Sequence, residues 1–141
     1  MFGLKTKKPG EFALHWQGTL SDYVTAIVYS PDGKTIAASD GAGEVVLCQG
    51  TGLEITVLQK ENGRSVDCLA FSQDGQFLAA AGQNGQVNIW QMQPEAPECV
   101  TTLENTAVWV DRLAWSPTQN LLAFSLGKYV QVWDAALGEI A

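Results

Sequence analysis

The stretch VDCLAFSQDGQFLAAAGQNGQVNIWQ, residues 66–91, contains two β-hairpins in succession. Three apolar runs, residues 66–72, 76–82 and 86–91, predict strands. Asp74-Gly75 separates the first two runs, and Asn84-Gly85 separates the second two. Asp-Gly and Asn-Gly between apolar runs are strong hairpin signals, because tight turns need residues that tolerate positive φ. We therefore expect an antiparallel sheet in this stretch.

The same pattern occurs before and after this stretch, which predicts a repeat protein. Ser30, Ser72 and Ser116 each end the first strand of a unit, so the units are spaced by about 42 to 44 residues. A period of about 40–45 residues with four short strands per unit is typical of a β-propeller blade. Segments 36–38 and 77–81 are apolar on both faces, which predicts sheets that pack between two neighbouring sheets.

Four segments of the repeats lie in phase: SPDGK (30–34), FSQDG (71–75), GQVNIW (85–90) and VQVWD (130–134). On these segments the chain resembles the WD-repeat propeller family, in a divergent, bacterial-type form. Trp133-Asp134 is a true Trp-Asp pair, whereas its equivalents are Cys48-Gln49 and Trp90-Gln91. The Gly-His pair that often precedes the first strand in this family is missing. The resemblance implies an all-β propeller with three four-stranded antiparallel blades, within a larger ring of about seven blades.

We predict a single propeller domain with five parts: a basic tail (1–10), a strand that closes the last blade (11–19), blade 1 (20–60), blade 2 (61–104) and a truncated blade 3 (105–141). Three blades cannot close a ring, because propellers have about 4–8 blades. Since Ala141 falls inside a predicted strand, we expect the chain to be the N-terminal portion of a longer propeller. The alternative is that another chain completes the ring, for instance two three-blade copies that make six.

Charge and cysteine content narrow the range of partners. The formal net charge is −7, from 15 acidic and 8 basic residues, and an acidic body repels phosphate. We therefore expect protein partners, with no nucleic acid and no membrane insertion. Cys48, Cys68 and Cys99 have no CxxC spacing, and the first two lie in apolar strands, which favours free thiols in a reducing cytoplasm. The style of SPDGKTIAAS (30–39) favours a bacterial protein.

The sequence shows no catalytic constellation. His15 is the only histidine, and it lies in a predicted outer strand without a nucleophile motif around it. Asp32 and Asp74 occupy tight turns, where Asp is expected to bond the backbone. The glycines serve β-turns and do not precede helices, so no phosphate-binding loop is predicted. We expect no enzyme activity, no cofactor and no metal.

Binding is better supported, because in this family the loops before each blade's first strand often contact partners. The residues at these places are Tyr23, Arg64, Ser65, Trp109 and Arg112. Tyr, Trp and Arg are enriched in interface hot spots. The alternative is that Trp109 packs between blades and that Arg112 pairs with Asp111 or Asp67.

The resulting hypothesis is a non-catalytic scaffold that mediates protein–protein interaction or complex assembly. One alternative is an enzymatic or small-ligand propeller whose site lies in blades outside this sequence, since fold does not dictate function. Another alternative is a self-assembling propeller fragment.

Overall fold

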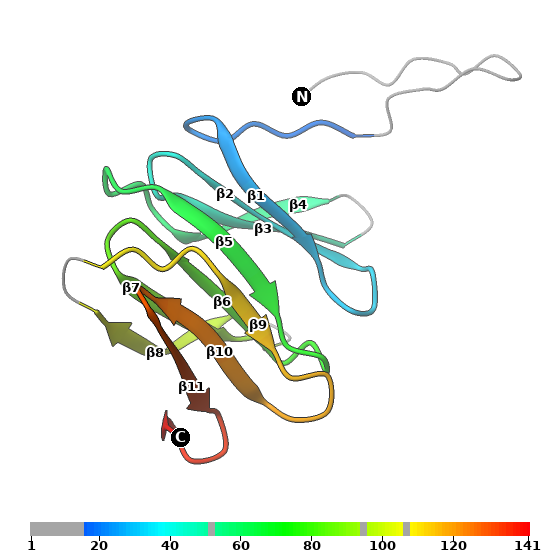
Figure 1. Cartoon of the computed structure of the whole chain (residues 1–141). Coiled ribbons are helices and arrows are strands. Elements are labelled where there is room, and N and C mark those ends of the chain that lie inside the picture. Colours follow the sequence, from blue (N-terminus) through cyan, green and yellow to red (C-terminus); the bar gives the residue numbers. More distant parts are fainter. Residues whose placement is uncertain (1–15, 51–52, 94–95, 106–107) are drawn as a thin grey trace, which may run out of the picture.

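The computed structural model describes residues 16–50, 53–93, 96–105 and 108–141 (Figure 1). Within these residues, twelve strands form three four-stranded antiparallel sheets, and each sheet is built from strands consecutive in the chain. We call these sheets blades 1, 2 and 3. They confirm the predicted all-β architecture of three four-stranded antiparallel units.

Each blade is a meander of four strands. Blade 1 consists of β1 (Val24–Tyr29), β2 (Thr35–Asp40), β3 (Val45–Gln49) and β4 (Glu54–Gln59). Blade 2 consists of β5 (Val66–Phe71), β6 (Phe77–Gly82), β7 (Gln86–Gln91) and β8 (Glu98–Glu104). Blade 3 consists of β9 (Leu113–Trp115), β10 (Leu121–Leu126), β11 (Tyr129–Asp134) and β12 (Glu139–Ile140).

The turn between the first and second strands is encoded by local side-chain bonds. In blade 2, Asp74 Oδ1 accepts hydrogen bonds from Ser72 Oγ at 2.8 Å and from the backbone N–H of Gln76 at 3.0 Å. Gly75 follows with φ of 75°, a conformation that glycine adopts without strain. Ser30 and Asp32 make the equivalent bonds in blade 1. The predicted hairpin turns are thus formed by the residues that predicted them.

The blades stack face to face, and their first strands lie together along one edge of the stack, which we call the inner edge. Figure 1 shows β1, β5 and β9 side by side and running in the same direction. One core cluster joins blades 1 and 2 and includes Ala37, Val45, Leu47, Leu69, Leu78, Ala80 and Trp90. A second joins blades 2 and 3 and includes Ala79, Ala81, Val87, Ile89, Leu122, Phe124 and Trp133. Blade 2 is therefore covered on both faces, as its doubly apolar strands require.

The two outward faces of the stack are apolar and largely uncovered. Val130 in blade 3 is 75% exposed, whereas its equivalents Val45 and Val87 are 0% exposed. Ile27 in blade 1 is 63% exposed, whereas its equivalent Leu69 is 7% exposed. Equivalent positions thus differ because, among the described residues, no blade packs against these two end faces.

The structure leaves the predicted closing strand untested, and the first strand of blade 3 differs from its equivalents. Of the predicted closing strand (11–19), residues 11–15 lie outside the described residues, and residues 16–19 form no strand. A strand needs a hydrogen-bonded neighbour, and the described chain places none beside this segment. The first strand of blade 3 has only three residues, Leu113–Trp115, whereas those of blades 1 and 2 have six. The backbone N–H of Val110 donates to the carbonyl of Gly82 in blade 2, at 3.1 Å.

Candidate functional site

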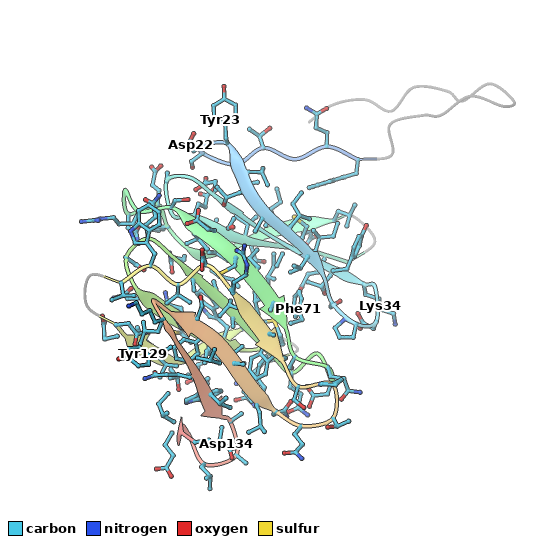
Figure 2. All side chains as sticks on the ribbon, viewed as in Figure 1. Asp22, Tyr23, Lys34, Phe71, Tyr129 and Asp134 are labelled. Atoms are coloured by element: carbon cyan, nitrogen blue, oxygen red, sulfur yellow. The ribbon has the colours of Figure 1, made fainter. Side chains whose placement is uncertain are left out.

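The candidate binding surface is the rim where the inner strands begin. We define the upper rim as the segments that lead into β1, β5 and β9 (20–23, 60–65 and 108–112) and the turns between the second and third strands (41–44, 83–85 and 127–128). Figure 2 shows Tyr23 projecting away from the sheets at this rim. Because the three inner strands run in the same direction, their starting segments lie along one side of the molecule.

Backbone hydrogen bonds fix the leading segments of blades 2 and 3 to the preceding blade. The N–H groups of Asn62 and Gly63 donate to the carbonyl of Ala42, at 2.8 and 2.9 Å. At the next junction, the N–H of Asn105 donates to the carbonyl of Gly85 at 3.1 Å. A Cβ on Gly85 would lie 2.0 Å from the Asn105 carbonyl oxygen, so this contact requires glycine. The rim is therefore a fixed platform, held by main-chain atoms.

A buried carboxylate positions the segment before β1. Asp40 is fully buried, and it accepts hydrogen bonds from the backbone N–H groups of Asp22 (3.1 Å), Ala42 (3.0 Å) and Glu44 (2.9 Å). The carbonyl of Tyr23, the residue after Asp22, accepts a hydrogen bond from the N–H of Gly41 at 3.0 Å. These bonds hold the backbone of Tyr23 while its side chain remains free.

The two aromatic residues predicted at this rim are both exposed. Tyr23 is 90% exposed and Trp109 is 63% exposed. The alternative in which Trp109 packs between blades therefore does not describe this structure. Large side chains held in solvent by an ordered backbone are available for contact with a partner, because little further ordering of the backbone is needed.

The polar residues of the prediction divide into two groups. Arg64 is exposed, and Arg112 has 83% of its side chain exposed. Arg112 Nη1 donates to the carbonyl of Asp111 at 2.8 Å and lies 3.9 Å from Asp111 Oδ2, so the predicted pairing with Asp111 is present. An ion pair this exposed contributes little stability. Ser65 is buried; its Oγ donates to Asp67 Oδ1, and its carbonyl accepts from the N–H of Gln83. Ser65 therefore joins rim loops to one another.

The structure adds one rim residue that the sequence analysis missed. Tyr129 follows the turn Gly127-Lys128 and is 73% exposed (Figure 2). Its equivalents are Glu44 and Gln86, which bond to neighbouring polar groups. An aromatic residue where the other repeats have polar ones was a usable signal. The predicted surface covers only the segments before the first strands, and Tyr129 lies at the start of a third strand.

Among the described residues, no cluster of catalytic or metal-binding side chains offers an alternative site. Among the residues it describes, no group of three or more His, Cys, Asp or Glu side chains is placed to hold a metal ion, and His15 lies outside them. The Ser30 hydroxyl and the backbone N–H of Lys34 lower the pKa of Asp32. A general acid working near neutral pH needs the opposite shift.

Cys48 is buried and Cys68 is half-buried, and both thiols are unreactive in character, whereas Cys99 is exposed. Burial raises the pKa of the Cys48 thiol, and burial together with the charges of Asp67 and Asp111 raises the pKa of Cys68 to about 12. Both thiols therefore stay protonated at neutral pH, whereas the thiolate is the reactive form. All three cysteines are free.

Comparisons with known proteins agree with the fold. Among similar proteins, Apoptotic protease-activating factor 1 of Rattus norvegicus is 34% identical over 57% of this chain and 7% of its own length. WD repeat and HMG-box DNA-binding protein 1 of Xenopus laevis is 32% identical over 77% of this chain and 10% of its own length. The solved structure of U3-55K superposes with a TM-score of 0.77 at 20% identity, over 88% of this chain and 39% of that one.

The chain thus spans a small part of these relatives, and the solved neighbour shows the fold alone. No helix among the described residues is long and apolar enough to cross a membrane. A family model described as "WD domain, G-beta repeat" matches residues 10–43, 53–91 and 97–134. These three matches cover most of the sequence. The second and third each run from the fourth strand of one blade through the first three strands of the next. The chain therefore belongs to the WD-repeat family.

Proposed function

We propose that this chain is a non-catalytic WD-repeat scaffold that binds a protein partner at its upper rim. WD-repeat proteins generally act as protein-interaction scaffolds, which is the coarse function that family membership supports. The observation that carries the proposal is the exposure of Tyr23 and Trp109 on a backbone held by hydrogen bonds. Exposed aromatics on a rigid surface are the common anchors of protein interfaces.

Four side chains make the contact in this proposal: Tyr23, Arg64, Trp109 and Arg112. Ser65 supports the surface from below, since its hydroxyl is already bonded to Asp67. Tyr129 extends the surface along blade 3. The net charge of −7 supports a protein partner over nucleic acid or an anionic membrane, because phosphate would be repelled. A cytoplasmic location without cofactor belongs to the same proposal.

We further propose that additional blades cover the two end faces and complete a ring of about seven. The exposure of Val130 and Ile27, at positions that are buried in the other blades, supports this proposal. The division into a tail (1–10), a closing strand (11–19) and blades at 20–60, 61–104 and 105–141 belongs to it. The rival is a ring made of two three-blade copies, which the same faces also favour. Light scattering measures the mass of the assembled ring and separates the two proposals. A ring of two copies has the mass of a dimer, whereas a ring made by a single longer chain has the mass of a monomer.

Site-specific photo-crosslinking tests the rim. A photo-reactive amino acid at position 23 or 109 should capture the same protein, whereas one at Lys34, on the opposite rim (Figure 2), should not. Binding of the captured protein is then measured directly. Tyr23→Ala and Trp109→Ala should each weaken it by about tenfold or more, as hot-spot truncations do. If Lys34→Ala weakens binding and the two aromatic variants do not, the proposed surface is wrong.

A further inference from the structure

A cleft of about 430 Å³ separates blades 1 and 2 on the rim opposite the upper rim, where Figure 2 labels Phe71 and Lys34. We call it the interblade cleft. A Cβ on Gly75 would lie 3.7 Å from Cδ of Pro31, so the first turns of the two blades approach each other at one side of the cleft. The walls include Pro31, Asp32 and Thr35 from blade 1 and Phe71, Asp74 and Met92 from blade 2.

Two small side chains leave this cleft open. Thr35 begins β2 as Phe77 begins β6, and Phe71 ends β5 as Trp115 ends β9. At the junction of blades 2 and 3, Phe77 and Trp115 stack with their ring centroids 5.8 Å apart. Threonine and phenylalanine are together much smaller than phenylalanine and tryptophan, so the first junction lacks this filling. The cleft is therefore specified by two side chains within an unbroken repeat of strands.

The walls of the cleft combine apolar and anionic side chains. Phe71 and Met92 are half-buried and pack against the core between blades 1 and 2. Asp32 and Asp74 are exposed. Asp32 Oδ1 accepts two hydrogen bonds from its own turn, whereas its Oδ2 has no hydrogen-bond partner among the described residues. The cleft thus offers a free carboxylate oxygen beside an aromatic ring.

The charge around the cleft favours a cation. Aspartate is ionised at neutral pH, and the Ser30 hydroxyl and the backbone N–H of Lys34 lower the pKa of Asp32 further. Glu98 adds another carboxylate, because it accepts a hydrogen bond from Nε2 of the wall residue Gln93 at 3.2 Å. Lys34 lies in the same turn as Asp32 but does not line the cleft, and no other basic residue of the described chain lines it.

An arginine side chain matches both kinds of wall. Its guanidinium is planar, so it can stack on an aromatic ring while its edge donates hydrogen bonds to a carboxylate. Its aliphatic stem suits an apolar wall such as Met92. A lysine ammonium is a compact and strongly hydrated charge that gains less from the ring.

We propose that the interblade cleft is a second binding site, which takes an arginine side chain of a partner protein between Phe71 and Asp32. The guanidinium lies on the ring of Phe71 and donates to Asp32 Oδ2. Asp74 adds negative charge on the blade 2 side. Residues that flank the arginine in the partner contact Met92 and Pro31. This site is independent of the upper rim, which lies on the other side of the molecule.

Methionine-methyl NMR on the whole chain tests the site. The sequence has two methionines, Met1 and Met92, so a chain labelled at the methionine methyl groups carries one reporter in the cleft, and Met92→Leu identifies its resonance. The probe is the peptide acetyl-Leu-Arg-Leu-amide. It should shift the Met92 resonance in a saturable way. The matched peptide with citrulline, which is neutral and nearly the same shape, should bind about tenfold more weakly or less tightly still.

Three results of this titration would overturn the proposal. The first is a Met92 resonance that does not move with the arginine peptide. The second is equal affinity for the arginine and citrulline peptides, which would show that the charge is not read. The third is equal affinity for arginine amide and the tripeptide, which would make the occupant a small cation and not a protein segment.

A charge-removing variant tests the role of Asp32. Asp32→Asn keeps an oxygen that can accept the two bonds of the turn but removes the charge, so it should weaken the arginine peptide about tenfold. Asp134→Asn is the matched control, because Asp134 also accepts two backbone bonds in a turn and lies outside the cleft. It should leave the affinity within about twofold. Equal losses in the two variants would show attraction by the general negative charge and would contradict the proposal.

A cleft-filling variant tests the space itself. Thr35→Phe/Phe71→Trp copies the pair that stacks at the next junction, so it should abolish the peptide-induced shift of Met92 without lowering the melting temperature. Wild-type affinity in this variant would overturn the proposal. If the variant unfolds, the Asp32→Asn and citrulline comparisons still decide the outcome.

Discussion

Between blades 1 and 2 the buried contact is mainly aliphatic, whereas between blades 2 and 3 three aromatic rings meet. In the first junction Trp90 packs among Ala37, Val45 and Leu47. In the second, Phe77 stacks on Trp115 at 5.8 Å between ring centroids, and both rings meet the edge of Trp133 at 6.4 Å. The same repeat frame is therefore filled by different side chains at successive junctions.

The two junctions also differ at the rim opposite the upper rim, which we call their lower ends. Trp115 Nε1 donates to the carbonyl of Ala70 at 2.9 Å, and Asn120 Nδ2 donates to Asp74 Oδ2 at 3.0 Å, so two direct bonds cross from blade 3 to blade 2. The equivalents in blade 2 are Phe71 and Gln76. A cleft of about 430 Å³ lies at this end of the first junction, between Asp32 and Phe71. The changes from Phe71 to Trp115 and from Gln76 to Asn120 thus accompany the difference between the two lower ends. The junction of blades 2 and 3 is hydrogen-bonded there, whereas the junction of blades 1 and 2 has a cleft.

The largest effect should come from the centre of the aromatic junction. Trp133 is 2% exposed and touches both other rings, so Trp133→Ala should lower the free energy of unfolding by about 3–5 kcal/mol. Phe71→Ala, at the cleft side of the other junction, should cost about 1–2 kcal/mol, because Phe71 is only half-buried. Urea unfolding followed by circular dichroism measures both. Equal losses would show that the two junctions do not differ in packing.

A smaller change separates packing from hydrogen bonding within the aromatic junction. Trp115→Phe removes the bond to Ala70 and should cost about 1–2 kcal/mol. Trp133 Nε1 is buried without a partner in the described structure, so Trp133→Phe removes an unsatisfied donor. The gain from removing it offsets lost packing, and the net change should stay within about 1 kcal/mol. Thermal unfolding of the two variants checks the order, and a greater loss for Trp133→Phe would contradict it.

These differences mark the limit of what the sequence predicts. Asp74-Gly75 and Asn84-Gly85 predicted their turns because turn chemistry is local, and the doubly apolar runs predicted the face-to-face stacking. The bond from Asn120 to Asp74 joins residues in different blades, so it depends on how the sheets sit together. The packing of Trp16 against Cys48 is not predictable from the sequence for the same reason, because it depends on how a segment lies on the face of a blade. The exposure of Trp109 also had to come from the structure, because an indole in a loop can fold inward or outward.

The smallest effect concerns the carboxylates at the two lower ends. Burial tends to raise the pKa of Asp74, but hydrogen bonds from the Gln76 N–H, the Asn120 amide and the Ser72 hydroxyl outweigh it, and the pKa is lowered. A lowered folded-state pKa favours the ionised carboxylate. The resulting stability is therefore present above the unfolded-state pKa and is lost as pH falls through the folded-state pKa. Asp32 follows the same sign but, among the described residues, has no hydrogen-bond partner from another blade.

Asn120→Ala should therefore separate the two acids. It removes the bond across the second junction, so the pKa of Asp74 should rise toward its ordinary value while that of Asp32 stays unchanged. The loss of stability at neutral pH should be under about 1 kcal/mol, because Asp74 is exposed to solvent screening. Carboxyl-carbon NMR titration of both residues measures the shifts. If both pKa values move together, Asn120 acts on the fold as a whole; if neither moves, the amide bond does not distinguish the two junctions in solution.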